Sequence, residues 1–265
     1  MEQIADTLEE KIKRLQLEAA QDASQAQQTG ALREIGSECR CESYGKIQDI
    51  IRTCDIYETP FEPKTCNTIK KVWHKTLSIA GIFERFQDAN FREINKRGVP
   101  EDVKSSYEKV KVYADNLSDN LKAGNGLVLK GPVGTLKTTL AIAVLQAALW
   151  QGFSGRKILM QSLLDEIFSR KAYNLEDWLK FERDLRECRL LVVDELGKHK
   201  SEGWVMTKFE AIVSERHERR RSTIFVTNLT AQEMRGLYSE GIIDRFNHVN
   251  EVVNFTGKSQ RVKGD

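Results

Sequence analysis

The sequence has almost no excess of charge of either sign and no long hydrophobic run. Lys and Arg number 41 against 39 Asp and Glu, a net charge of +2, and such a balance excludes a histone-like or polybasic protein whose whole surface binds nucleic acid. The longest apolar run, residues 140–149, is interrupted by Gln146 and is too short to span a bilayer. The first residues are acidic and lack the apolar stretch of a signal peptide. Hydrophobic residues make up 40% and charged residues 30% of the chain, so we expect a globular protein of the cytoplasm without a membrane partner.

The chain also lacks the even number of cysteines that a set of disulfides would need. The chain has five, and without a secretory signal an odd number does not indicate a disulfide framework. Four of them lie close together in a segment with few large apolar residues, where a metal is often recruited because so short a stretch builds little core. We expect a Zn²⁺ site made of Cys39, Cys41, Cys54 and Cys66. Ordinary reduced cysteines are the alternative, since the spacing of the pairs is irregular, and the remote Cys188 is expected in the core.

The length of 265 residues predicts one or two domains. Between Ile4 and Leu15, apolar residues recur every three or four positions in an acidic stretch. This spacing predicts an amphipathic helix that either packs on its own domain or binds a partner. We therefore expect a small helical and zinc-binding region, residues 1–72 with the zinc module at 39–66, followed by a larger domain, residues 73–265.

Within the larger domain, short apolar runs alternate with longer helical stretches. Pro100 marks the start of a helix in which apolar residues recur from Val103 to Tyr113 at steps of three and four. Strands separated by helices predict an α/β fold with a parallel sheet covered on both faces. The expected strands lie at 127–129, 158–160, 190–193, 223–226 and 249–255.

The first of these strands leads into a glycine-containing turn and then into an apolar helix, residues 140–150. The turn reads Gly-Pro-Val-Gly-Thr-Leu-Lys-Thr, and strand, turn and helix together form the context of a phosphate-binding loop, or P-loop, whose backbone N–H groups face an anion. Lys137 is expected to reach the β- and γ-phosphates of ATP, and the Thr138 hydroxyl to ligate Mg²⁺. The residues expected to bind the nucleotide are Gly131, Pro132, Val133, Gly134, Thr135, Leu136, Lys137, Thr138 and Thr139.

One position departs from the P-loop pattern. The glycine expected before the lysine is Leu136, and a left-handed backbone there costs a side chain about 1–2 kcal/mol. We expect this residue to slow turnover more than it weakens nucleotide binding.

Polar residues also follow two later strands. Asp194 and Glu195 come directly after the apolar run at 190–193; Asp194 is expected to hold the water shell of Mg²⁺, and Glu195 to orient and deprotonate the attacking water. Asn228 follows the next strand and is expected to sense the γ-phosphate, with a simple turn residue as the alternative. Since the carboxyl ends of parallel strands meet at one edge, these side chains and the P-loop predict a single phosphate site.

Several arginines lie near the end of the chain. Arg245 and Arg261 are of the type that stabilises charge on a transferred phosphoryl group, although their spacing alone equally suits surface residues. The basic run 216–221 closes a helix before a strand. We expect a capping or solvated role for it, because cations are favoured at helix C-termini, with nucleic-acid contact as the alternative.

Together these motifs resemble the AAA+ helicase loaders of the DnaC/DnaI type and their relatives, the IstB-like transposition ATPases. The resemblance covers roughly residues 78–262. It rests on Ala80–Phe86, Ala89–Phe91, the P-loop Gly131–Thr138, Leu191–Gly197, Thr227-Asn228 and Ile243–Phe246. It implies an AAA+ P-loop NTPase with a five-stranded parallel sheet, an arginine finger at Arg245 and a sensor-2 arginine at Arg261. In such proteins a cysteine-rich zinc module and a helicase-binding region commonly precede the ATPase, which implies these roles for residues 1–72.

The function that the resemblance implies is ATP-dependent loading of a hexameric replicative helicase onto single-stranded DNA at the initiation of replication. The AAA+ modules would assemble side by side, so that Arg245 of one subunit touches the ATP of its neighbour. The implied cofactors are ATP, Mg²⁺ and Zn²⁺, and the implied catalytic residues are Lys137, Asp194, Glu195, Asn228, Arg245 and Arg261. Two alternatives stay open: a transposition helper that coats duplex DNA and recruits a transposase, and a nucleotide-binding scaffold in which Leu136 has weakened hydrolysis. The acidic N-terminal helix and the cysteine module favour the loader.

Overall fold

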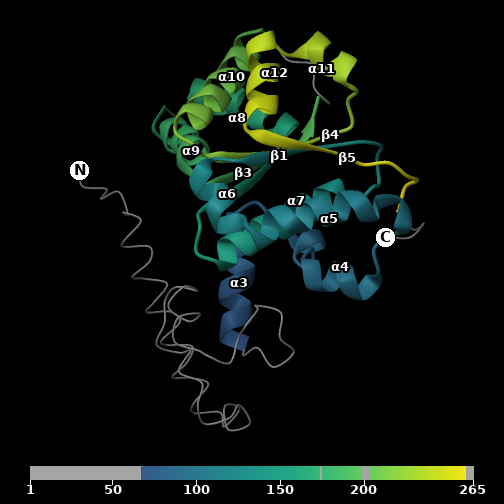
Figure 1. Ribbon diagram of the computed structural model, residues 1–265. Coiled ribbons are helices and arrows are strands. Elements are labelled where there is room, and N and C mark those ends of the chain that lie inside the picture. The colour runs from purple at the N-terminus through teal and green to yellow at the C-terminus, as the bar shows by residue number, and fades with distance from the viewer. Residues whose placement is uncertain (1–66, 174, 198–202, 261–265) are drawn as a thin grey trace, which may run out of the picture. The chain divides into compact units, whose positions relative to one another are not determined.

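The computed structural model describes residues 67–173, 175–197 and 203–260, shown as coloured ribbon in Figure 1. The chain divides into two units, Met1–Lys75 and Thr76–Asp265. The N-terminal helix and the cysteine cluster that the sequence predicts lie outside the described residues. The described elements, in chain order, are α3 (Asn67–Ile79), η2 (Glu84–Phe86), α4 (Phe91–Arg97), α5 (Glu101–Asp115), α6 (Leu117–Ala123), β1 (Gly126–Lys130), α7 (Lys137–Trp150), β2 (Gly155–Leu159), α8 (Met160–Tyr173), α9 (Leu175–Glu187), β3 (Leu190–Leu196), α10 (Gly203–Glu218), β4 (Ser222–Thr227), α11 (Ala231–Leu237), α12 (Glu240–His248) and β5 (Asn250–Asn254).

The strands of the second unit form one parallel sheet in the order β2-β3-β4-β1-β5. β1 lies between β4 and β5, with Val128 paired to Phe225 on one side and to Val252 on the other. The expected five-stranded parallel sheet is therefore confirmed. The strand expected at 158–160 begins earlier, at Gly155, because its charged residues pair with β3 along the whole strand and Met160 already opens α8.

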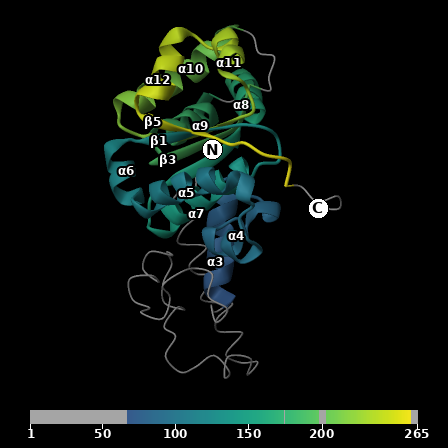
Figure 2. The same cartoon turned by 45° about the vertical axis from the view of Figure 1, so that its right-hand side comes forward.

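Helices cover both faces of this sheet (Figures 1 and 2). On one face α7 packs against β1, β2, β3 and β4, with α5 beside it on β5 and α6 on β4. On the other face lie α8, α10 and α12, and α9 packs on α8 and α10. The expected helix at 140–150 is present and starts at Lys137, and the expected helix after Pro100 is present as α5. Because the sheet, α5 and the segment before α4 all contact α7, it is apolar on nearly all sides.

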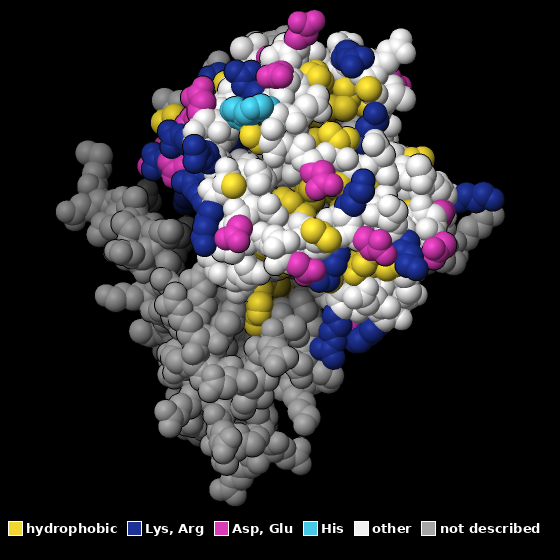
Figure 3. Space-filling view, viewed as in Figure 1, with side chains coloured by type: hydrophobic (Ala, Val, Ile, Leu, Met, Phe, Trp, Pro, Cys, Tyr) yellow, Lys and Arg dark blue, Asp and Glu magenta, His cyan; other side chains and the backbone are white. Residues whose placement is uncertain are grey.

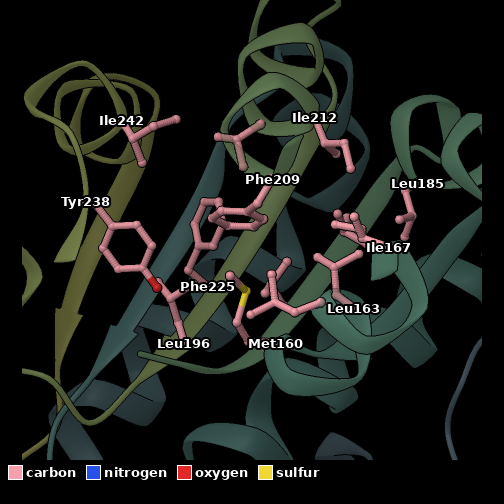
Figure 4. Close-up of a cluster of buried hydrophobic side chains, with 14 of the residues drawn as sticks. Met160, Leu163, Ile167, Leu185, Leu196, Phe209, Ile212, Phe225, Tyr238 and Ile242 are labelled. Atoms are coloured by element: carbon pink, nitrogen blue, oxygen red, sulfur yellow. The ribbon is translucent and has the colours of Figure 1, made fainter. Parts of the chain in front are cut away.

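A hydrophobic core lies between the sheet and the helices α8, α10 and α12. The ring of Phe225 in β4 packs at a tilt against that of Phe246 in α12, with 4.3 Å between ring centroids. Met160, Leu163 and Phe209 belong to the same cluster. Figure 4 shows Phe225, Met160, Leu163 and Phe209 converging from the sheet and from the helices that cover it. Alternate strand residues point to the opposite face, where Leu127, Leu129, Val192 and Ile224 are buried. Both faces are thus buried, so that functional groups gather at the ends of the strands.

In the part of the chain that the structure describes, no helix combines the length and the apolar character needed to cross a membrane.

Candidate nucleotide-binding site

The P-loop connects the end of β1 to the first residue of α7. Gly134 has φ 83°, and a side chain at this position would collide with Ser259. Leu136 has φ 64° and ψ 4°, which is the left-handed conformation. The strain expected at Leu136 is therefore present, since a side chain occupies a backbone geometry that glycine adopts freely. The loop ends at the N-terminus of a 14-residue helix, where backbone N–H groups and the helix dipole favour an anion.

Lys137 has its ammonium group inside the loop. Its Nζ donates to the carbonyls of Gly131 at 2.9 Å and Pro132 at 2.5 Å, and lies 3.3 Å from Thr135 Oγ1. Thr135 is buried and donates in turn to the Pro132 carbonyl at 2.8 Å. The lysine is thus held in the centre of the loop, where its charge faces the anion site.

Thr138 and Asp194 meet across the gap between α7 and β3. The Thr138 hydroxyl donates to Asp194 Oδ1 at 3.0 Å, and the backbone N–H of Glu195 donates to the same oxygen at 2.9 Å. Asp194 is 3% exposed. A hydroxyl and a carboxylate next to an anion site are the hard oxygen donors that Mg²⁺ prefers, so these two residues fit the role expected of them.

Glu195 has a strained backbone. Its φ is 58°, and the pairing of β3 with β4 shifts register between Val193 and Leu196. Such irregularities often re-aim a side chain next to an active site. Glu195 is half-buried beside Asp194, and its role as a base stays a prediction.

Asn228 follows the last residue of β4, at the same end of the sheet. The preceding Thr227 is fixed by two contacts: its hydroxyl donates to the Leu196 carbonyl at 2.9 Å and accepts the Leu229 N–H at 3.0 Å. The Thr227 carbonyl accepts the N–H of Gly131 at the start of the P-loop, at 3.3 Å. The sheet therefore brings Lys137, Thr138, Asp194, Glu195 and Asn228 to one edge, as expected.

The segment after β5 runs along the P-loop, which the sequence does not reveal. The N–H of Gln260 donates to the Gly134 carbonyl at 2.8 Å. Asp102, in the first turn of α5, accepts the Lys258 N–H at 3.0 Å and the Gln260 side chain at 3.3 Å. A side chain at Gly257 would collide with Asp102. Arg261 itself lies outside the described residues.

Lys157 is a site residue that sequence reasoning missed. It lies in β2, and its Nζ is 3.7 Å from Asp194 Oδ2, with the two side chains 7% and 5% exposed. No motif marks this position; the one available signal is a lysine two residues before the end of the edge strand β2. It adds a positive charge to the site opposite Thr138.

Arg245 is not part of this cluster. It lies on α12, on the face of the sheet opposite α7, and its guanidinium donates to the Gly241 carbonyl of the same helix at 2.8 Å. The site geometry alone therefore assigns no role to Arg245.

The expectation of a capping or solvated role for the run 216–221 is wrong for its first residue. Arg216 is 1% exposed. Its guanidinium donates to the carbonyls of Leu185 at 2.6 Å, Cys188 at 2.9 Å and Ser222 at 2.5 Å, and to Thr223 Oγ1 at 3.0 Å. Its burial is favourable because buried backbone carbonyls at the amino end of the sheet would cost free energy without a hydrogen-bond donor. Burial raises the pKa of the neighbouring Cys188 thiol, which packs against the core as expected.

The remaining arginines of the run lie on the surface. Arg219 and Arg220 are exposed and Arg221 is half-buried, and Arg219 pairs with Glu215 at 2.6 Å. On the face shown in Figure 3, acidic and basic side chains are interspersed, and basic ones gather at the left edge of the described surface. The near-zero net charge is thus reflected in a mixed surface.

The chain is similar in sequence and in fold to known proteins of DNA replication. The chain is 26% identical over 196 residues to the replicative helicase loader DnaC of Escherichia coli strain K12, which covers 72% of this chain and 77% of that protein. The crystal structure of the DnaC helicase loader has a similar fold, with a TM-score of 0.57, 22% identity, and coverage of 66% of this chain and 100% of that one. AMPPCP-bound DnaA from Aquifex aeolicus also has a similar fold, with a TM-score of 0.54 at 19% identity over 65% of this chain and 52% of that one.

The resemblance to AAA+ loaders of the DnaC type that the motifs suggest is thereby confirmed. The family match covers residues 109–265, more than half of the chain, and includes the P-loop, both carboxylates and Asn228. The chain belongs to the family described as IstB-like ATP binding protein.

Proposed function

We propose that this protein is an ATP-dependent loader that binds a hexameric replicative helicase and puts it on single-stranded DNA during the initiation of replication in the cytoplasm. The observation that supports this most is a site that joins the P-loop to the strand-end carboxylates, in a chain similar to a replicative helicase loader over 72% of its length.

The proposed chemistry is hydrolysis of ATP at the carboxyl edge of the sheet. Lys137 binds the β- and γ-phosphates from the centre of the loop, since its ammonium is already held there by the loop carbonyls. Thr138 and Asp194 would hold Mg²⁺, which when bound neutralises phosphate charge. Glu195 accepts a proton from the attacking water, and Asn228 donates to the γ-phosphate.

Two arginines would complete the site. Arg261 is proposed as the sensor-2 residue; its neighbour in sequence, Gln260, is bonded to the P-loop at Gly134. Arg245 is proposed as a finger that reaches the ATP of an adjacent subunit, which suits a residue on the other face of the sheet from α7.

Mixed variants test the action of Arg245 between subunits. Arg245→Ala and Lys137→Ala proteins should each lose assembly-dependent hydrolysis, and a mixture of the two should regain part of it because one interface then carries an intact finger and an intact loop. A rate per subunit that is independent of protein concentration and unaffected by Arg245→Ala would refute this assignment.

The N-terminal region, residues 1–72, is proposed to bind the helicase and to hold one zinc ion through the cysteines at 39, 41, 54 and 66. Elemental analysis of the full chain should give about one zinc per chain. Unchanged metal content after Cys41→Ser would remove these ligands from the assignment.

Co-purification with a hexameric replicative helicase tests the proposed function directly. We expect a complex that forms in the presence of ATP and fails when residues 1–72 are removed. Capture of a transposase instead, with coating of duplex DNA, would identify the protein as a transposition helper, an alternative that the IstB-like family match supports. Nucleotide binding without measurable hydrolysis would favour a scaffold, which the strained Leu136 supports.

A further inference from the structure

Lys157 is a buried cation with no role in the proposed hydrolysis of ATP. An ammonium group taken out of water costs free energy unless an anion or other acceptor faces it. Here the facing anion is Asp194, whose Oδ2 lies 3.7 Å from Nζ. The ring of Phe86 adds a second favourable contact, with its centroid 5.9 Å from Nζ.

The two oxygens of Asp194 have different surroundings. Oδ1 accepts hydrogen bonds from the Thr138 hydroxyl and from the Glu195 N–H. Oδ2 faces the ammonium of Lys157. One oxygen of this carboxylate thus accepts a hydrogen bond from the P-loop threonine, and the other faces a lysine of the sheet.

The lysine is held in place by the segment before α4. Its backbone N–H donates to the Ala80 carbonyl at 2.7 Å, and a side chain at Gly81 would collide with its carbonyl. Gln146 of α7 donates to the carbonyls of Phe86 and Gln87 at 3.1 and 3.0 Å, which fixes the ring beside the ammonium. Lys157 therefore has a defined position, and its charge stays next to Asp194.

We propose that Lys157 is a positioning residue that competes electrostatically with Mg²⁺ for the Asp194 carboxylate. Its positive charge keeps the carboxylate oriented and partly neutralised, so that a divalent cation gains less from Asp194 than it would from an uncompensated acid. The metal then binds strongly only together with the phosphates of the nucleotide. This inference rests on the proposed nucleotide site.

Arg156 provides a matched comparison on the same strand. It carries the same charge, but it pairs with Asp184 at 3.2 Å, its side chain is 28% exposed, and it lies over Phe181, 5.6 Å from the ring centroid. Phe181 belongs to the core on the other face of the sheet. Loss of Arg156 therefore removes one charge from β2 without changing the surroundings of Asp194.

The experiment measures binding of fluorescent N-methylanthraniloyl-ADP to the full chain while Mg²⁺ is raised from an EDTA-buffered start. In Lys157→Met, the Mg²⁺ concentration at half-maximal binding should fall by about fivefold or more, because a cation close to the metal site is gone. Lys157→Arg and Arg156→Met should keep the wild-type midpoint. As a second readout, Mg²⁺ with ADP should raise the melting temperature of Lys157→Met more than that of the wild type, because the metal replaces the missing counter-charge.

The outcomes separate this inference from the proposed function. If the wild type binds no nucleotide at any Mg²⁺ concentration, the proposed nucleotide site is wrong. If the wild type binds and Lys157→Met has the same or a higher midpoint, the competition is wrong and Lys157 is purely structural. Should Lys157→Met fail to fold, Lys157→Gln removes the charge and keeps a polar side chain, and the same fall in midpoint is required of it.

Discussion

At the carboxyl end of the sheet a buried lysine faces a carboxylate, whereas at the amino end a buried arginine is surrounded by backbone carbonyls. Lys157 lies 3.7 Å from Asp194, and Arg216 donates to Leu185, Cys188 and Ser222. Both cations are withdrawn from water. They differ in whether the partner group also belongs to the candidate nucleotide-binding site.

The acceptors of Arg216 are mostly backbone carbonyls, together with the Thr223 hydroxyl and the Cys188 sulfur. Their hydrogen bonds join the end of α9 and the start of β4, so that arginine acts as part of the fold. Asp194, in contrast, also accepts a bond from the P-loop residue Thr138, and a bound metal would change its charge balance. A buried charge whose partner also belongs to a ligand site can influence function, and one whose partners lie away from that site contributes to stability.

A substitution at the carboxyl end of the sheet should have the greatest effect on ATP hydrolysis. Glu195→Gln should leave nucleotide binding intact and reduce hydrolysis by about two to four orders of magnitude, because an amide cannot accept the proton of the attacking water. Lys137→Ala, in comparison, should weaken binding itself. Phosphate release and fluorescent-nucleotide titration measure the two effects. Wild-type hydrolysis by Glu195→Gln would mean that the base lies elsewhere.

The next effect concerns stability at the amino end. Arg216→Met should cost about 3–5 kcal/mol of unfolding free energy, because several buried carbonyls lose their donor together. Urea unfolding should show a lower midpoint with an unchanged slope. Arg219→Met is the control: its side chain is 51% exposed, so we expect a loss within about 1 kcal/mol. Equal losses in the two variants would contradict a structural role for Arg216.

Much of this arrangement is predictable from the sequence because it depends on local patterns. Apolar runs between helical stretches predict the strands, and the strand-turn-helix context predicts the P-loop together with the left-handed Leu136, which the structure bears out. Asp194 and Asn228 are predictable because residues that follow parallel strands meet at one edge of a sheet.

The features that were missed depend on residues far apart in sequence. Arg216 lies in a charged run typical of a helix end, and its burial is decided by carbonyls some thirty residues earlier, at Leu185 and Cys188. Lys157 has no motif, and its partner in β3 is known only once the two strands pair. The contacts of Asp102 with Lys258 and Gln260 join the first turn of α5 to the end of the described chain, which no local pattern indicates.

Relief of backbone strain at the two ends of the sheet should change the free energy of unfolding only slightly. Leu136 has φ 64° at the nucleotide site, and Arg220 has φ 50° at the amino end. Substitution by glycine relieves about 1–2 kcal/mol of strain but adds about 0.4–1 kcal/mol of chain entropy to the unfolded state. Leu136→Gly and Arg220→Gly should therefore each stabilise the protein by up to about 1.5 kcal/mol in urea unfolding.

The two variants should differ in hydrolysis, since only one of them changes the loop that holds the phosphates. Leu136→Gly should raise the rate of ATP hydrolysis, because the loop then adopts its bound geometry without opposition from a side chain, whereas Arg220→Gly should leave the rate unchanged. A steady-state phosphate-release assay at saturating ATP measures both. If Leu136→Gly gains stability without a gain in rate, loop strain does not limit turnover. If both variants gain in rate, the effect arises from general stabilisation, and the distinction between the two ends of the sheet fails for backbone strain.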